Sequence, residues 1–135
     1  MYLYKKGSRT PIPDPDVQEM IRTEATRLGV EQRKISEQEI IERCIYALIV
    51  EGARILEDGI ATRASDIDVI WINGYGFPRH RGGPMHYADS IGAGKICNAI
   101  SRFQKRPGLG YWSAPDLLKN MVKNRSGFAE LATGK

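Results

Sequence analysis

Apolar and polar positions follow their most regular pattern between residues 36 and 59. Apolar side chains recur there at three- and four-residue spacing, as on one face of an α-helix. These positions are Ile40, Ile41, Cys44, Ile45, Leu48, Ile49, Gly52, Ala53, Ile55 and Leu56. Ser36 with Glu39 three residues later matches a capping box, and Gly59 suits the residue that follows a helix. We therefore predict a central helix with a wide buried face and a close helix crossing at Gly52.

Shorter patterns predict helices on both sides of the central one. After an extended segment with several prolines, a first helix is expected from Asp14 or Pro15 to about Leu28, with Asp14 as its cap. Residues 64–74 predict a short helix capped by Ser65 and closed by Gly74.

The C-terminal half predicts three more helices. They are expected at 84–92, at about 94–104 and at 115–124, the last capped by Ser113. A turn is expected at 105–112, and a loose tail in which Phe128 docks should follow the last helix. No strand-type alternation competes with this interpretation, so the predicted fold class is all-α.

The stretch "NGYGFPRHRGGPM", residues 73–85, is rich in turn-forming residues. Glycines permit positive φ and close backbone approach, and prolines stiffen the path, so a rigid corner between two helices is favoured. Phe77 is expected to anchor the loop in the core. Arg79 and Arg81 are expected to meet either an anionic ligand or the acidic ends of neighbouring helices. The residues expected to shape the loop are Gly74, Gly76, Phe77, Pro78, Gly82, Gly83 and Pro84.

The acidic residues are expected to play structural roles. Glu51, Glu57, Asp58, Asp66 and Asp68 lie where helix caps and solvated faces favour acids. Asp89, just past the glycine-rich loop, is expected to bond the free amides of that loop, a structural role that is favoured over acid–base chemistry.

Two phosphate-binding motifs fail on inspection. "GAGK", ending at Lys95, has Asp89 at the first glycine of a P-loop and Ile96 at the magnesium-binding Ser or Thr. "GYGFPR" has Arg79 at the third glycine of a dinucleotide fingerprint and follows a helix. We therefore expect this chain to bind no nucleotide cofactor through either motif.

Histidines and cysteines give no metal or catalytic pattern. His80 and His86 lack a third ligand at suitable spacing, and no partnering base or nucleophile is evident. Cys44 and Cys97 are expected to be reduced and to act as small core hydrophobes, which fits a reducing compartment.

Length and charge narrow the function classes. The 135 residues suit one domain, and 20 basic against 16 acidic residues give a net charge of +4. The basic residues are scattered, so we expect no nucleic-acid partner. The longest apolar stretch, Cys44 to Val50, is too short to span a bilayer, and no export signal is evident. A cytoplasmic location is expected if the protein is bacterial.

Several segments of the chain resemble a known protein family. The segment "KISEQEIIERCIYALIVEGARILEDGIATRASDIDVIWINGYGFPRHRGGPMHYADSIG" resembles the last domain of the multifunctional enoyl-CoA hydratase/3-hydroxyacyl-CoA dehydrogenases of fatty-acid β-oxidation. The opening "YLYKKGSRTPIPDPDV" resembles the linker before that domain, and "PDLLKNMVKNRSGF" resembles its end. The likeness rests on 39–43, 51–52, 56–57, 64–68, 76–78, 81–84, 87–89 and Gly92.

The resemblance implies a helical bundle like the C-terminal domain of 6-phosphogluconate dehydrogenase. In full-length relatives this is the second of two related helical copies, which together form an internal counterpart of the dimer of shorter dehydrogenases. A Rossmann domain would bind NAD and supply a catalytic His–Glu pair, which cannot be mapped onto His80 or His86. The implied division is a linker over 1–13, the dehydrogenase C-terminal helical domain over 14–128, and a tail over 129–135.

The resemblance therefore implies part of an NAD-dependent L-3-hydroxyacyl-CoA dehydrogenase, without activity by itself. Its partners would be the Rossmann and first helical domains, an acyl-CoA substrate, and possible further copies of itself. Asn73, where relatives often carry an aromatic residue, would edge the acyl-CoA cleft together with Arg79 and Arg81. The alternative is a free-standing helical module that binds CoA thioesters or mediates oligomerisation. Met1 would mark a fragment boundary or begin a split gene product.

Overall fold

The computed structural model describes residues 2–105 and 112–131 and is dominated by helices, so the all-α prediction is confirmed. The helices are α1 (Pro15–Arg27), α2 (Glu37–Glu57), α3 (Ala64–Gly74), α4 (Pro84–Ile91), α5 (Ala93–Gln104) and α6 (Asp116–Asn124). Two 3₁₀ turns, η1 (Arg79–Arg81) and η2 (Phe128–Glu130), complete the helical elements. Most of the turn expected at 105–112 lies outside the described residues. No described helix is long and apolar enough to cross a membrane.

The chain divides into two compact units, Met1–Ile35 and Ser36–Lys135. The first unit contains a short antiparallel pair of strands, β1 (Tyr2–Leu3) and β2 (Ile12–Pro13), where an extended segment was expected. It also contains α1, which Asp14 caps as predicted by accepting hydrogen bonds from two backbone amides. No residue of α1 is buried within the described residues.

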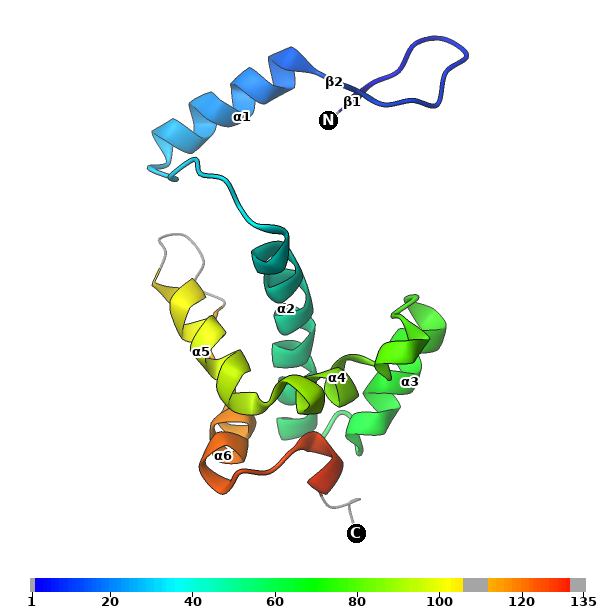
Figure 1. The fold of residues 1–135 in the computed structure, drawn as a ribbon, viewed down its shortest axis with the longest axis vertical. Coiled ribbons are helices and arrows are strands. Elements are labelled where there is room, and N and C mark those ends of the chain that lie inside the picture. Colours follow the sequence, from blue (N-terminus) through cyan, green and yellow to red (C-terminus); the bar gives the residue numbers. More distant parts are fainter. Residues whose placement is uncertain (1, 106–111, 132–135) are drawn as a thin grey trace. The chain divides into compact units, whose positions relative to one another are not determined.

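The second unit contains the hydrophobic core. Helix α4 crosses α2 and contacts both α3 and α5, as Figure 1 shows. The face predicted for α5 is confirmed, because Ile96, Ala99, Ile100 and Phe103 are all buried. The other buried members of the core are Tyr46, Ile49, Val50, Ala53, Ile67, Met85, Ala88, Trp112, Leu118, Met121 and Phe128.

Helix α2 begins and ends as its sequence predicts. The Ser36 hydroxyl accepts a hydrogen bond from the Glu39 amide at 3.2 Å. At the other end Gly59 has a φ of 69°, and the Ile60 amide donates to the Ile55 carbonyl at 3.0 Å. This pattern is a Schellman motif, which satisfies carbonyls that the helix itself leaves unpaired.

The buried face of α2 is narrower than predicted. Ile40 and Ile41 are about half exposed, and Cys44 is exposed, because the helices of this unit pack against the face that carries Ile49. The expected core role of Cys44 is therefore wrong. Cys97 is partly buried, and this burial raises the pKa of its thiol.

The predicted cap of α3 is also wrong. The helix already begins at Ala64, so Ser65 lies inside its first turn. Arg63 occupies the cap position without a side-chain cap bond, and its guanidinium pairs with the Asp66 carboxylate at 2.7 Å.

The close crossing predicted at Gly52 is present and leads to a first testable prediction. A Cβ atom added there would lie 2.5 Å from the sulfur of Met85, which is fully buried. Gly52→Ala is expected to gain about 1 kcal/mol of helix propensity but to lose about 1–3 kcal/mol through overpacking. The net result should be destabilisation by up to about 2 kcal/mol in urea unfolding.

A double-mutant cycle tests the cause of that loss. Adding Gly52→Ala to a Met85→Ala background should stabilise the chain, because the obstructing side chain is gone. A Gly52→Ala variant more stable than the wild-type chain would contradict the tight crossing.

Candidate functional site

The glycine-rich loop joins the end of α3 to the start of α4. Its path is fixed by Phe77, which is 8% exposed and whose amide donates to the Trp71 carbonyl at 3.0 Å. The turn η1 follows, and Gly82 and Gly83 then bring the chain to Pro84 with positive φ angles. The loop therefore has a buried anchor at one side and a glycine pair at the other.

Asp68 binds the backbone at the end of this loop, where α4 begins. It projects from α3, is only 9% exposed, and accepts hydrogen bonds from the amides of Met85 at 2.7 Å and His86 at 3.1 Å. Helix α4 has no side-chain cap of its own, so the Asp68 carboxylate caps it from a neighbouring helix. Asp68 was expected at a helix cap or on a solvated face, and it is a cap, but it is buried and caps a helix other than its own.

The electrostatics of Asp68 combine opposing effects. Burial raises its pKa, and the hydrogen bonds from the Met85 and His86 amides offset part of that increase. Because its pKa is higher in the folded chain than in the unfolded chain, folding favours the protonated form. The stability that this group contributes is greatest below its unfolded pKa and is lost as pH rises through its folded pKa.

This sign gives a second prediction, which compares the wild-type chain with Asp68→Asn. The free energy of unfolding of the wild-type chain should fall relative to that of the variant as pH rises from about 3.9 upward. Urea unfolding of both proteins between about pH 3 and pH 7 measures the difference. A wild-type chain that gains stability relative to the variant over this range would contradict the raised pKa.

Glu57, like Asp68, caps a helix far from it in sequence. Glu57, at the end of α2, accepts a hydrogen bond from the Leu117 amide in the first turn of α6. Ser113 therefore does not cap α6, as was expected, and its hydroxyl instead accepts a bond from Arg54 at 3.0 Å.

Asp89 has the expected type of role with a different partner. Its carboxylate accepts bonds from the Phe128 amide at 2.7 Å and the Ala129 amide at 2.9 Å, both in η2, instead of from the glycine-rich loop. Phe128 is buried as predicted, and the segment around it forms the turn η2 where a loose tail was expected. Residues 132–135 lie outside the described part.

The three candidate ligand residues lie around η1. An Arg79 guanidinium nitrogen donates to the Asn73 side-chain oxygen at 3.2 Å, and the Asn73 amide nitrogen donates to the Val69 carbonyl at 2.9 Å. The Arg81 guanidinium carbon lies 5.4 Å from the centre of the Tyr87 ring. Asn73 and Arg79 are thus in direct contact, while Arg81 faces an aromatic ring that the sequence did not single out.

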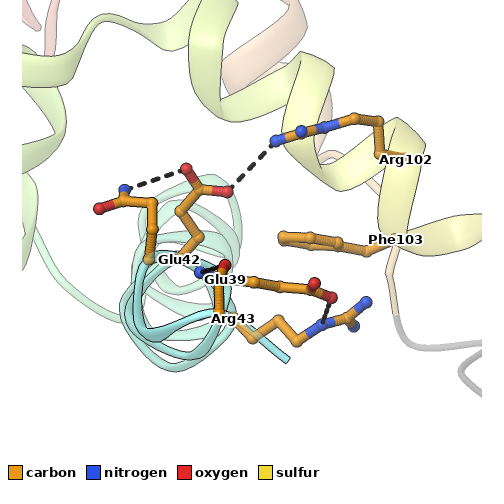
Figure 2. Close-up of a pocket in the computed structure, with 7 residues that line it drawn as sticks. Glu39, Glu42, Arg43, Arg102 and Phe103 are labelled. Atoms are coloured by element: carbon orange, nitrogen blue, oxygen red, sulfur yellow. Dashed lines mark hydrogen bonds and ion pairs between the residues drawn. The ribbon is translucent and has the colours of Figure 1, made fainter. Parts of the chain in front are cut away.

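A pocket of about 240 Å³, separate from the glycine-rich loop, lies between the first turns of α2 and the end of α5. Figure 2 shows Arg43 and Arg102 beside the Phe103 ring, with the Arg43 guanidinium carbon 4.1 Å from its centre. Arg43 pairs with Glu39 at 2.9 Å, and Arg102 pairs with Glu42 at 3.2 Å. Because each labelled guanidinium faces a carboxylate, this pocket offers a ligand little net charge.

Neither a dinucleotide-binding fingerprint nor a cluster of metal ligands is present in the described residues. Within residues 2–105 and 112–131 the strands are the two short ones of the first unit, and Arg79 holds the third fingerprint position on a 3₁₀ turn. The same ranges contain no group of three His, Cys, Asp or Glu side chains that could hold a metal ion. His86 Nδ1 lies 3.3 Å from the Arg81 carbonyl oxygen.

These features define a helical domain whose loops are fixed by carboxylates that cap neighbouring elements. The family model described as "3-hydroxyacyl-CoA dehydrogenase, C-terminal domain" matches residues 40–132. This match covers more than half of the chain, and the chain belongs to that family.

Named relatives support the same assignment. The chain is 45% identical over 127 residues to the peroxisomal bifunctional enzyme of Danio rerio, covering 93% of this chain and 18% of that protein. It is 38% identical over 123 residues to the Homo sapiens enzyme of the same name, covering 90% and 17%. It is 37% identical over 129 residues to the fatty acid oxidation complex subunit alpha of Acinetobacter baumannii (strain SDF), covering 93% and 17%. The chain thus spans less than a fifth of the length of these relatives.

Proposed function

We propose that this chain is the helical C-terminal part of an NAD-dependent L-3-hydroxyacyl-CoA dehydrogenase of fatty-acid β-oxidation. The observation that carries the proposal is the family match over residues 40–132. In this role the domain packs against the Rossmann and first helical domains of the dehydrogenase, and its glycine-rich loop edges the acyl-CoA cleft.

Exposed apolar side chains on the second unit support a packing role. On α3, Val69 and Ile70 are 57% and 58% exposed, and Tyr75, just after the helix, is 71% exposed. Apolar side chains grouped on one helix are typical of a surface that another protein element covers. We propose that the other dehydrogenase domains cover this face.

The chemistry itself is assigned to residues outside this chain. NAD and the catalytic His–Glu pair belong to the Rossmann domain in this proposal, so the chain alone is inactive. The proposed division keeps a linker over 1–13, the dehydrogenase helical domain over 14–128 and a tail over 129–135. The proposed location is cytoplasmic if the source is bacterial, whereas the zebrafish and human relatives are named as peroxisomal.

A complementation experiment tests the proposal. The segment matching this chain is deleted from the zebrafish relative, and NAD-dependent oxidation of a 3-hydroxyacyl-CoA is measured with and without this chain added in trans. We expect the truncated enzyme to lose dehydrogenase activity and this chain to restore part of it. Turnover by this chain alone, or failure to associate with the truncated enzyme, would contradict the proposal.

Matched variants locate the packing face in the same assay. Val69→Asp with Ile70→Asp should abolish association, because two charges would be buried at the interface. Asn98→Asp with Ser101→Asp adds the same charge at two exposed positions of α5 and should associate normally. If both pairs associate equally well, the face on α3 is not the packing surface. A chain that binds acetoacetyl-CoA without associating would favour the free-standing module.

A further inference from the structure

Arg79 and Arg81 differ from the ion-paired arginines of the described residues. Arg79 is held by the neutral side-chain oxygen of Asn73, and Arg81 faces the ring of Tyr87. Ion pairs with carboxylates are formed by Arg22, Arg27, Arg43, Arg54, Arg63 and Arg102. The two guanidinium groups of η1 are therefore oriented by neutral side chains, which do not neutralise their positive charge.

Asn73 is well suited to orient a cation without neutralising it. Its amide nitrogen is fixed to the Val69 carbonyl at 2.9 Å, which directs its oxygen toward Arg79 at 3.2 Å. A phenylalanine or tryptophan at this position could not accept that bond. An aspartate could accept it but would cancel the charge.

The surroundings of η1 select the kind of ligand. Arg79 and Arg81 are exposed at the two ends of a three-residue turn, whereas Phe77 is buried and offers no ring for an acyl chain or a base. Guanidinium groups bind phosphate oxygens through paired, charge-assisted hydrogen bonds. Such a site matches the charged end of a CoA thioester better than its acyl end.

We propose that Arg79 and Arg81 form a phosphate-binding site for the nucleotide end of CoA, with Asn73 and Tyr87 as positioning residues. The choice of CoA rests on the proposed function, and the phosphate chemistry rests on the loop. Because the site is exposed, its affinity is electrostatic and falls as salt is raised.

Calorimetric titration of the 135-residue chain at low ionic strength tests the site. The probes are CoA, dephospho-CoA, which lacks the 3′-phosphate, and pantetheine, which lacks every phosphate. CoA should bind and pantetheine should not. Dephospho-CoA binding as tightly as CoA assigns the site to the diphosphate, and weaker binding assigns it to the 3′-phosphate. Pantetheine binding as tightly as CoA overturns the proposal, as does the absence of any CoA binding.

Charge-matched variants separate this site from general attraction. Arg79→Gln with Arg81→Gln should weaken CoA binding about tenfold or more. Arg22→Gln with Arg27→Gln makes the same change in net charge at arginines paired with Glu19 and Glu24, and should leave binding nearly unchanged. Equal losses in the two variants would show non-specific attraction and overturn the site.

Asn73→Asp tests positioning while both arginines remain. The new carboxylate would lie beside Arg79 and should weaken CoA binding in a chain whose helical circular dichroism is unchanged. Unchanged affinity in this variant overturns the role of Asn73. The complementation assay tests the proposed function independently of this site. The variant Arg79→Gln with Arg81→Gln should lose CoA binding but should still associate with the truncated relative.

Discussion

Replacing Asp68 with alanine should destabilise the second unit by about 2–4 kcal/mol. The substitution removes the acceptor for two amides at the start of α4, one of them fully enclosed, and a buried unpaired amide costs about 1–3 kcal/mol. Urea unfolding followed by circular dichroism measures the loss. An effect of this size is a large share of the stability of a small domain.

Asp68→Asn separates the hydrogen bonds from the negative charge. The asparagine oxygen can still accept from the Met85 amide, while its amide nitrogen cannot accept from His86. Because burial raises the pKa of Asp68, a neutral side chain also avoids the cost of enclosing a charge. The asparagine variant should therefore lose less stability than the alanine variant. Equal losses in the two variants, or an alanine variant within about 0.5 kcal/mol of the wild-type chain, would contradict the capping role.

Features predictable from the sequence depend on residues close together in the chain. The periodic apolar face of α5 and the cap at Ser36 are local, and both are present in the structure. Ser65 failed as a predicted cap because α3 already begins at Ala64, whereas Ser113 failed because Glu57 caps α6 in its place. The side chains of Asp68 and Glu57 cap the starts of α4 and α6 from positions up to 60 residues away, which spacing along the chain cannot reveal.

The sequence did contain one signal of these distant caps. Gly83 and Pro84 begin α4 without a residue whose side chain could cap it, so the free amides required an acceptor from elsewhere. Asn73 and Arg79 were both predicted as ligand residues of the loop. Their contact with each other could not be predicted, because it depends on how α3 ends. Tyr87 was missed because nothing in the spacing shows that Arg81 turns back toward α4.

Gly83→Ala should have the largest effect of any single substitution considered. Gly83 has a φ of 96° and a ψ of 170°, a region that glycine alone adopts readily, so alanine there costs about 1–3 kcal/mol in backbone strain. A Cβ atom would also collide with the Asp68 carboxylate, at a further cost of about 1–3 kcal/mol. The expected total is about 2–6 kcal/mol, measured by urea or thermal unfolding.

Two comparisons isolate the causes of that loss. Gly94→Ala, in the first turn of α5, has open space at its Cβ position and no positive φ, so it should be neutral or slightly stabilising. In an Asp68→Gly background the collision disappears while the backbone strain persists, so Gly83→Ala should still cost about 1–3 kcal/mol there. If Gly83→Ala instead causes no loss of stability in that background, the collision with the Asp68 carboxylate alone explains the requirement for glycine at this position. The glycine would then serve the packing of α3 against α4, and the turn itself would tolerate a side chain.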